Sequence, residues 1–557
     1  MLKRIHRSKR ALLRAGLFGC AATCAVPAMA IAIDTGNPDL TGRWDNSIRL
    51  NAGVRTQAQD QRILNNQNFD ESDGKFAKGD LVTKRFDLLT ELDLNYKNTF
   101  GVRVSGAAWY DAAYSDTKVR ATAPGGFDSS YYNNEYNATV KRFTRGPSGE
   151  ILDAFAWVNF RIADKPANLK VGRLTNYWGE SYVLGAHAIS YSQSPVDGVK
   201  AVTSPGIELK EVFLPLGQIY FKYQPTPNLS LAAQYFVEWK PSRLPHGGTF
   251  LAPADIFFEG PDRLPLAPGY AIPRLESIKP KNAGNFGLSA KLNVEAIEST
   301  VGLYYRQFDD YMPWFAPNLS FAGATPTAYQ LVYPKKVKML AASFARVIGA
   351  VSVGADLSYR MGGALNAGPM LNPANSEGAR GDTWHAVVNG VYLLPKTPLF
   401  DTGFVLAELA YNRLQKVTSN EASYGREGSA TACFNMATGA VGDKSDGCST
   451  RDYLGMALIF TPQYLQVRPS WDLETPLSLT YGIRGNAPTS GGGNEGALAW
   501  SLGAKATYAQ KHEFQLLYSA QQARSKYDAA GTKLVGGNGS TGTTDRGWLA
   551  LTYKTSF

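Results

Sequence analysis

Beyond its first 30 residues, the sequence lacks the long apolar runs that membrane helices need. No window of ~18 consecutive apolar residues occurs there, which excludes a helix spanning a bilayer of roughly 30 Å. Cysteine is almost as scarce, with four residues in 557, and Cys20 and Cys24 lie in the first 30. The remaining pair, Cys433 and Cys448, has too few neighbouring ligands for a metal site. In a small-residue, polar loop of an exported protein this pair predicts a disulfide.

Catalytic motifs are also missing. The chain has no GxSxG, HExxH or P-loop, and its one GxGxxG lies in a Gly-rich loop that no helix follows. The five histidines have no ligand spacing and stand at His6, His187, His246, His385 and His512. The sequence therefore predicts no enzyme, no cofactor and no metal. A Ser–His pair assembled in space stays open as an alternative, because such sites are not visible in local sequence.

The first 30 residues have the features of a secretory signal peptide. Six Lys or Arg side chains precede a short, interrupted apolar stretch that ends in Ala28-Met29-Ala30. An N-terminal membrane anchor is the alternative, and Cys20 and Cys24 are poor lipid-attachment sites. Without the peptide the formal charge falls from +10 to +4, since 51 cations then face 47 anions. This mild balance gives no support for nucleic-acid binding.

Alternation of apolar and polar residues runs through the rest of the chain. Residues 86–96 place Leu88, Leu92 and Tyr96 on one face and Asp87 and Glu91 on the other. Residues 100–111, 285–296 and 498–508 behave in the same way. The apolar face often finishes on Tyr or Trp, which is typical of an aromatic girdle at a membrane interface.

Loop lengths distinguish a membrane barrel from a soluble β-sandwich, because the strands of a sandwich also alternate apolar and polar residues. We predict strands at 43–56, 84–97, 99–114, 150–163, 168–178, 217–225, 228–240, 283–295, 298–312, 334–346, 350–362, 382–394, 399–413, 451–463, 472–485, 497–509, 512–525 and 546–557. Every second connection is short, and the others are long and rich in Gly, Pro, Asn and Ser. This pattern predicts an all-β, antiparallel transmembrane barrel of about 18 strands (range 14–18) that occupies residues 31–557. An even count leaves both termini on the short-turn side, and the long loops are expected outside the cell.

The chain ends in GWLALTYKTSF, where Tyr553 and Phe557 share the apolar phase of a final strand. An aromatic last residue resembles the signal by which outer-membrane barrels are recognised for insertion. We therefore predict an outer-membrane location in a Gram-negative bacterium. Outer-membrane lipid and the barrel-assembly machinery are the partners expected there.

The connection after the fifth strand is long but too apolar for a solvated loop. It carries Val183, Leu184, Ile189 and Phe213 among few charges. Folding inward would bury these side chains against the inner wall, where irregular backbone is tolerated. We expect residues 179–215 to form a constriction in the lumen, here called the hatch. A compact cap outside the barrel is the alternative.

This region also carries a family resemblance. VGRLTNYWGES, SPVDGVK and SPGIELKEVFLP, with KFAKGDLVTKRFDLLTELDLNYKNTFGVRVSGAAWYDAAY, VRPSWDLETPLSLTYGIRG and the closing TDRGWLALTYKTSF, resemble the domain-of-unknown-function (DUF) family 1302 of proteobacterial outer-membrane proteins. One departure is Gly547-Trp548, where the family more often has an aspartate–aromatic pair. The resemblance implies handling of a hydrophobic or lipid-like molecule. It also implies a periplasmic or lipoprotein partner and a resistance-nodulation-division (RND) type permease.

The positions that match the family motifs are Arg173, Trp178, Gly179, Glu180, Ser181, Pro195, Asp197, Pro205, Gly206, Lys210 and Glu211. Their roles in the family are unknown, and holding the hatch in place is as good an interpretation as ligand contact. If Glu180 is buried it needs a cation, and Arg173 and Lys210 are the expected candidates.

Function classes remain in competition at this stage. We favour a substrate-selective uptake channel for a hydrophobic or aromatic small molecule over a general diffusion porin. A non-transport surface protein and a membrane-embedded hydrolase rank lower. Aromatic side chains predicted to face inward favour the selective channel. They are Trp109, Phe155, Trp157, Phe236 and Phe308, and the inward charges beside them are Arg103, Asp111, Arg161 and Arg306. The predicted passage residues are Trp178, Glu180, Ser181, Asp197, Lys210, Glu211, Arg103, Trp109, Asp111, Trp157 and Arg161.

Overall fold

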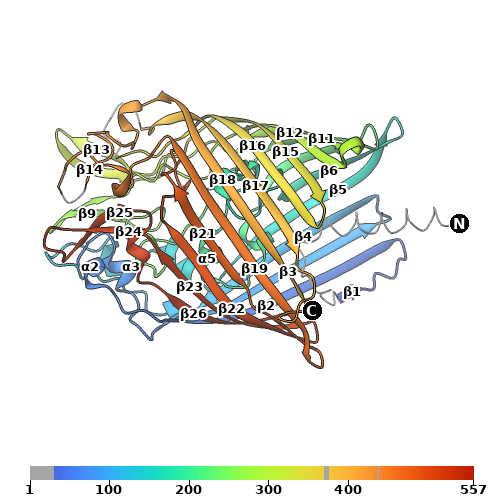
Figure 1. Ribbon diagram of the computed structural model, residues 1–557, viewed down its shortest axis with the longest axis horizontal. Helices are drawn as coiled ribbons and strands as arrows, with labels where there is room; N and C mark the ends of the chain where they lie inside the picture. The colour runs from blue at the N-terminus through green and yellow to red at the C-terminus, as the bar shows by residue number, and fades with distance from the viewer. Residues whose placement is uncertain (1–30, 369–375, 436–437) are drawn as a thin grey trace.

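The computed structural model describes residues 31–368, 376–435 and 438–557, so the predicted signal peptide lies outside the described residues. The chain forms one closed antiparallel barrel of 18 strands, as predicted (Figure 1). Its wall strands are β2 (Leu40–Arg55), β3 (Leu81–Tyr96), β4 (Phe100–Asp111), β5 (Ser148–Ile162), β6 (Lys165–Leu174), β7 (Leu216–Tyr223), β8 (Leu229–Phe236), β11 (Phe286–Val294), β12 (Ser299–Phe308), β15 (Val337–Ile348), β16 (Val351–Ala364), β17 (Arg380–Leu393), β18 (Thr402–Ser419), β19 (Asp452–Arg468), the interrupted β20 (Trp471–Glu474) with β21 (Leu477–Arg484), β22 (Leu498–Tyr508), β23 (His512–Gln522) and β26 (Trp548–Ser556).

Each wall strand pairs with its neighbours along the chain, and the last strand closes on the first. In that closing pair Asn51 lies opposite Thr552, and Leu50 lies opposite Tyr553. Closure removes the free edges that an open sheet would expose in lipid. The short strand β1 (Ile31–Ile33) adds to the edge of β2.

The remaining elements are short and lie between the wall strands. Three hairpins are formed by β9 (Arg263–Ala267) with β10 (Tyr270–Pro273), β13 (Asn318–Ala322) with β14 (Thr325–Gln330), and β24 (Arg524–Tyr527) with β25 (Leu534–Asn538). The helices are α2 (Gln61–Leu64), α3 (Asp70–Asp73), α4 (Ala138–Val140), α5 (Gly198–Thr203) and α6 (Leu209–Val212). Single turns are η1 (Ala112–Tyr114), η2 (Tyr132–Asn134), η3 (Lys141–Arg145), η4 (Gly185–His187), η5 (Ile189–Ser192), η6 (Glu295–Ile297), η7 (Glu421–Ser423), η8 (Lys444–Asp446) and η9 (Thr541–Thr543). No helix in the described ranges is long and apolar enough to cross a membrane.

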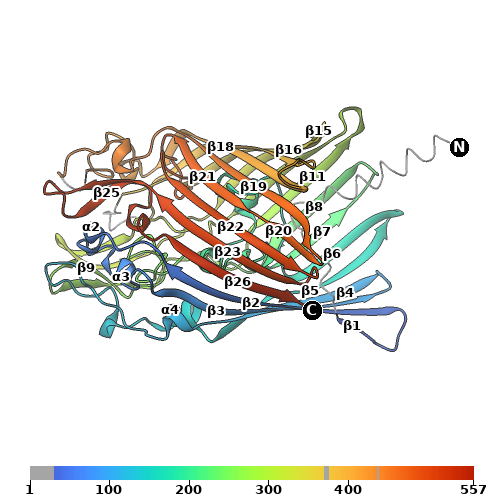
Figure 2. The same cartoon turned by 60° about the horizontal axis from the view of Figure 1, so that its bottom comes forward.

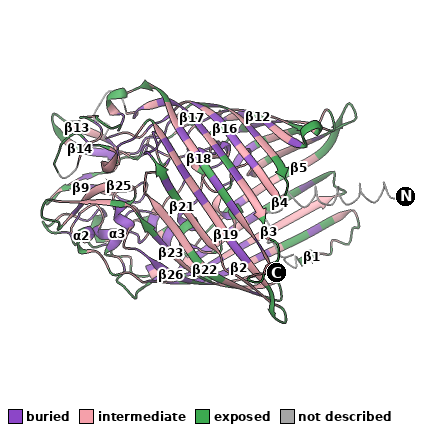
Figure 3. Ribbon diagram, viewed as in Figure 1, coloured by how far each residue is buried: buried purple, intermediate pink, exposed green. Residues whose placement is uncertain are grey.

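The alternation in the sequence becomes two different faces of the wall (Figure 3). Outward positions expose large apolar side chains, such as Leu303 at 60% and Leu551 at 54%. Inward positions are polar and buried, such as Asp87 and Glu408. An apolar outer belt around a polar interior is the pattern of a membrane-spanning barrel.

The two rims of the barrel differ in the length of their connections (Figures 1 and 2). Tight turns such as 97–99, 163–164 and 349–350 lie at one rim, where the C-terminus also ends. Connections such as 112–147 and 237–285 lie at the other. We call these the short-turn rim and the long-loop rim.

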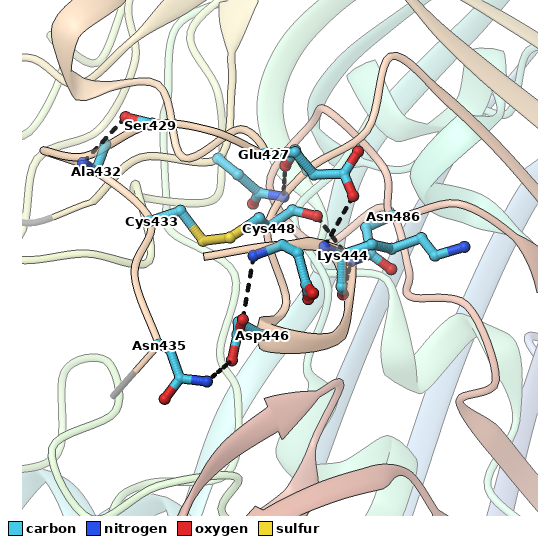
Figure 4. Close-up of a disulfide and its surroundings, with 12 residues drawn as sticks. Glu427, Ser429, Ala432, Cys433, Asn435, Lys444, Asp446, Cys448 and Asn486 are labelled. Atoms are coloured by element: carbon cyan, nitrogen blue, oxygen red, sulfur yellow. Dashed lines mark hydrogen bonds between the residues drawn. A yellow bond between two sulfur atoms is a disulfide. The ribbon is translucent and has the colours of Figure 1, made fainter. Parts of the chain in front are cut away.

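The predicted disulfide is confirmed in the connection between β18 and β19. Cys433 and Cys448 are bonded, with their Cα atoms 5.7 Å apart (Figure 4). The Asn486 side chain donates to the carbonyl of Cys448 at 2.8 Å, so the bridge is fixed to the next long connection as well. The disulfide therefore tethers loops at the long-loop rim and lies outside the wall strands.

Candidate functional site: a chamber between the hatch and the wall

The hatch folds into the barrel and contacts inward side chains of strands far apart in the sequence. Near its start it meets Asp356 of β16 and Glu408 of β18, and near its end it meets Arg49 of β2. Its regular structure is limited to η4, η5, α5 and α6, because glycine and proline recur through it. Most of its backbone N–H groups consequently need partners outside helices or strands.

Two carboxylates of the wall supply such partners. Glu408 accepts the backbone N–H groups of Tyr182, Val183 and Leu184 at 2.7, 3.0 and 2.5 Å. It also accepts the hydroxyl of Ser181 at 3.1 Å. Three successive N–H groups around one carboxylate form an anion-binding nest, and charge-assisted bonds of this kind are the strong ones.

The second of these carboxylates is Asp356 of β16, which is separated from Glu408 of β18 by the one strand β17. It accepts from the backbone of Glu180 at 2.9 Å and of Ile189 at 3.4 Å. Together the two acids of the wall fix residues 180–189 of the hatch.

A chain of hydrogen bonds through two buried histidines holds the same region. His187 Nε2 is 2.8 Å from the carbonyl of Gly492, which can only accept, so Nε2 carries the proton. In the neutral ring His187 Nδ1 is then the acceptor for His385 Nδ1, 3.1 Å away. His385 Nε2 in turn accepts from the hydroxyl of Thr383 at 2.9 Å. Burial lowers the pKa of His187 to about 4, which keeps this arrangement neutral.

Beside these histidines, a guanidinium clamps the hatch backbone. Arg360 donates to the carbonyls of Ala186 and Ala188, each at 2.9 Å. Its positive charge adds to the burial that disfavours protonation of His187.

The far end of the hatch is fixed by ion pairs. Arg49 of β2 binds Glu211 at 3.0 Å, and Lys554 of β26 binds Glu208 at 2.9 Å. Burial disfavours the ionised form of Glu208, but Lys554 and Lys210 outweigh it and lower its pKa to about 2. These charges pair with one another across the hatch and the wall.

A chamber of about 390 Å³ lies between the hatch and the wall on the remaining side. The hatch contributes Val183, Ala201, Val202 and Pro205. The wall contributes mostly small or hydroxyl side chains. The residues lining the chamber from that side are Ile459, Ser478, Leu479, Thr480, Ala499, Trp500, Ser501, Leu517, Ser519, Ala520, Gln521, Thr543, Arg546 and Trp548. Its volume lies within the ~300–1,000 Å³ typical of small-molecule sites.

The register of β19, β21, β22 and β23 explains why space remains here. Ser478 lies opposite Ile459 and Ser501, and Thr480 lies opposite Ala499. Inward positions on adjacent strands therefore carry short side chains side by side, whereas Asp87, Asp356 and Glu408 on other strands reach the hatch. The chamber exists because the hatch is anchored to one part of the wall and small residues cover the other.

Segment 246–252, here called the roof, closes the chamber toward the long-loop rim. Leu251 lines the chamber, and its neighbours Phe250 and Ala252 offer their carbonyls to Arg546 Nη1 at 2.7 and 2.8 Å. The Tyr131 hydroxyl donates to the carbonyl of Gly247 at 2.6 Å. The roof is thus held by residues of two other connections.

The predicted passage residues in the hatch, and Trp178 just before it, have anchoring contacts. Trp178 is buried against Tyr304, with ring centroids 5.6 Å apart. Ser181 binds Glu408, and Glu211 binds Arg49, as described above. The other two hatch residues bind acids or bases of neighbouring segments, Asp197 with Arg243 at 2.9 Å and Lys210 with Glu91.

The expected partner of Glu180 was wrong. Arg173 instead binds Glu238 at 2.7 Å, because β6 places it beside the end of β8. Lys210 is taken by Glu91 and Glu208. The cation nearest to Glu180 is Lys291 of β11, at 3.9 Å. This distance is long, and burial raises the pKa of Glu180.

The predicted passage residues of the wall also lie outside the chamber. Arg103 pairs with Asp93 at 3.2 Å and with Glu91, and Lys200 of the hatch lies 4.4 Å over the ring of Trp109. The other three residues contact close neighbours. The Asp111 carboxylate accepts a hydrogen bond from the Thr83 hydroxyl, and Trp157 packs on Gly101. Arg161 donates to the carbonyl of Asp164.

Sequence reasoning missed the chamber, the roof and the two anchoring acids. One signal was available, because inward serine, threonine and alanine recur in 477–484 and 498–508. The sequence carries no such signal for the anchoring role of Glu408, since its partners lie about 226 residues away.

A closed barrel with an apolar outer belt, an in-folded hatch and unequal rims defines a transmembrane β-barrel of the outer-membrane type. The chain belongs to the family described as "Protein of unknown function (DUF1302)", whose model matches residues 11–557. No curated protein matches the sequence.

The chain is also similar to several solved structures at low sequence identity. Pseudomonas aeruginosa OpdK with vanillate is 12% identical over 93% of this chain and 98% of that one, with a TM-score of 0.41. Acinetobacter baumannii OccAB1 is 10% identical over 93% and 96%, with a TM-score of 0.42. A BenF-like porin from Pseudomonas fluorescens Pf-5 is 10% identical over 93% and 99%, with a TM-score of 0.40.

Proposed function

We propose that the protein is a selective outer-membrane channel that carries a small, chiefly apolar molecule past the hatch through the chamber. The observation that supports this most is the chamber itself, which lies inside the barrel between the hatch and a wall of small side chains. Apart from Arg546, its lining includes no ionisable acid or base among the described residues, so an apolar solute would lose little on entering.

A general diffusion porin fits this interior less well. Such a channel needs an open, water-filled lumen. Here the hatch lies inside the barrel and is hydrogen-bonded to the wall, and the roof is hydrogen-bonded to Arg546. Passage would then require the hatch or the roof to move. The periplasmic lipoprotein and the RND-type permease remain predictions from the family resemblance.

The test fills the chamber. Ser501 lies inside and bonds Ser478 at 2.8 Å, so Ser501→Trp would occupy the space. Ala342→Trp on the outward face of β15 is the matched control. In cells, expression of the wild type should raise accumulation of the apolar probe N-phenyl-1-naphthylamine, and Ser501→Trp should lower it several-fold.

Surface-assembled protein is quantified in the same cells, so that a loss of accumulation is assigned to passage and not to assembly. Unchanged accumulation on expression of the wild type would refute the channel. Large ohmic conductance with passage of sugars would show a general porin instead.

A further inference from the structure

Arg546 is the one residue of the chamber lining, within the described part of the chain, that carries a charge. Its side chain is 1% exposed and lies at the end toward the long-loop rim, two residues before β26 begins. Nη1 is occupied by the roof carbonyls, and Nε lies 3.4 Å from Asp73 Oδ1. Neither Nε nor Nη2 has a hydrogen-bond acceptor among the residues that the structure describes, so the contact of Nε with Asp73 is an ion pair only.

An unpartnered buried donor is costly, because a buried N–H that has left water normally finds an acceptor. The rest of the lining at this end is apolar or hydroxyl-bearing, with Leu251 from the roof and with Thr543 and Trp548 close to Arg546 in the chain. A solute whose apolar body fills the chamber could supply the missing acceptor.

We infer that Arg546 recognises the head group of the transported molecule, which is an uncharged, chiefly apolar compound with a hydrogen-bond acceptor such as a carbonyl at one end. This inference rests on the proposed function and names its class of solute.

The charges around Arg546 favour a neutral acceptor over an anion. Asp73 lies between Arg546 and Arg55, and Arg55 also binds Asp545 at 3.1 Å. The guanidinium groups of Arg546 and Arg55 therefore already face the carboxyl groups of Asp73 and Asp545. A carboxylate on the solute would add an unbalanced charge to a chamber whose described lining holds no further cation, and burying such a charge is expensive.

Quenching of tryptophan fluorescence tests this, because Trp548 lines the chamber and bromine quenches on contact. Protein in lipid nanodiscs is titrated with 4-bromoacetophenone, 4-bromoethylbenzene and 4-bromobenzoate. Trp548→Phe identifies the chamber signal among the ten tryptophans. The ketone should bind about tenfold more tightly than the hydrocarbon, as expected for a hydrogen bond to a charged donor. The anion should bind more weakly than the ketone.

Arg546→Met should bring the ketone-to-hydrocarbon ratio close to one, and Thr543→Val at the same end should preserve it. If Arg546→Met does not assemble, the wild-type ratio still decides. Equal binding of ketone and hydrocarbon, or tightest binding of the benzoate, would overturn the head-group inference while leaving the channel intact. Failure of all three probes to quench Trp548 would instead count against the chamber as a binding compartment, and thus against the proposed function.

Discussion

Phe557 and Asn46 exchange two backbone hydrogen bonds, from Phe557 N to Asn46 O at 2.9 Å and from Asn46 N to Phe557 O at 2.8 Å. The last residue of the chain therefore completes the seam between β26 and β2. Two residues further along the same edge of β2, Trp44 pairs with Ile31 of β1. The C-terminal residue and β1 together cover an edge that would otherwise present unpaired N–H and C=O groups.

Deleting Phe557 should reduce assembly far more than stability. Its side chain is 36% exposed, so the lost apolar contact is worth ~2–3 kcal/mol at most. The predicted recognition signal and the seam bonds disappear with it. Heat-modifiable mobility of outer-membrane fractions measures assembled barrel, and Phe557→Tyr is the conservative control. Normal levels after deletion would show that the C-terminus is not the signal.

The orientation of the barrel follows from the two rims. Cysteines at Tyr132 and Glu276 in long connections should react with an impermeant maleimide on intact cells. Cysteines at Lys165 and Thr226 near short turns should react only after lysis. All four positions are exposed, so accessibility within the protein does not limit the reaction. The reverse pattern would invert the assignment.

Loss of the disulfide should leave the barrel folded. Cys433 and Cys448 join parts of one connection, so Cys433→Ser with Cys448→Ser frees only that loop. The lost stabilisation of roughly 3 kcal/mol, from loop closure in the unfolded chain, would be confined to this loop. Protease cleavage within 420–451 should accelerate while heat-modifiable mobility of the barrel is retained. Loss of that mobility would mean that the bridge supports the wall.

Local periodicity explains why the wall was predictable and the chamber was not. The alternation of Leu549, Leu551 and Tyr553 is legible within one strand, and loop lengths then gave the rims and the strand count. The chamber depends on which residues face one another across strands, as Ser478 and Ser501 do, and sequence alone does not set that register.

Inward polar residues pose the same difficulty in the candidate site. The sequence around an inward residue such as Arg103 or Glu408 does not show whether that residue lines a pore or anchors a segment. Only their partners show that they anchor, because Glu408 binds hatch backbone and Arg103 binds other wall acids. The predicted passage residues have mostly structural contacts, and their part in passage stays a prediction.

Acid should loosen the hatch near His187. Its pKa is about 4 in the folded protein and about 6.5 when unfolded, so the unfolded state binds more protons between these values. Stability conferred by this group is full above pH 6.5 and is lost as the pH falls toward 4. A proton on His187 Nδ1 would also remove the acceptor for His385.

Single-channel conductance should therefore rise as the pH falls from 7 to 4. His187→Gln, which keeps a donor for the Gly492 carbonyl but does not titrate, should flatten this rise. A rise of equal size in the variant would assign the effect to other groups.

Excision of the hatch should convert a tight channel into an open pore. Replacing residues 179–215 by a short Gly/Ser bridge removes the segment that crosses the lumen and exposes Asp356, Glu408 and Arg360 to water. Conductance should rise several-fold, and cells should become sensitive to large antibiotics that are normally excluded. An excised barrel that assembles and conducts no better than the parent would show that the hatch does not limit passage.

Glu408→Gln should give a milder form of the same effect. The amide keeps one acceptor oxygen but loses the charge and brings N–H donors toward the N–H groups of Tyr182, Val183 and Leu184. The nest then lacks its anion, and residues 181–184 should fluctuate between bound and released states. Flickering openings in planar bilayers are the expected readout, together with faster amide exchange across 181–184. Glu474→Gln is the control, because Glu474 binds Lys505 at 2.9 Å near the short-turn rim. If both variants flicker alike, the effect is a general loss of wall charge; if neither does, the anchor at Glu408 does not hold the channel closed.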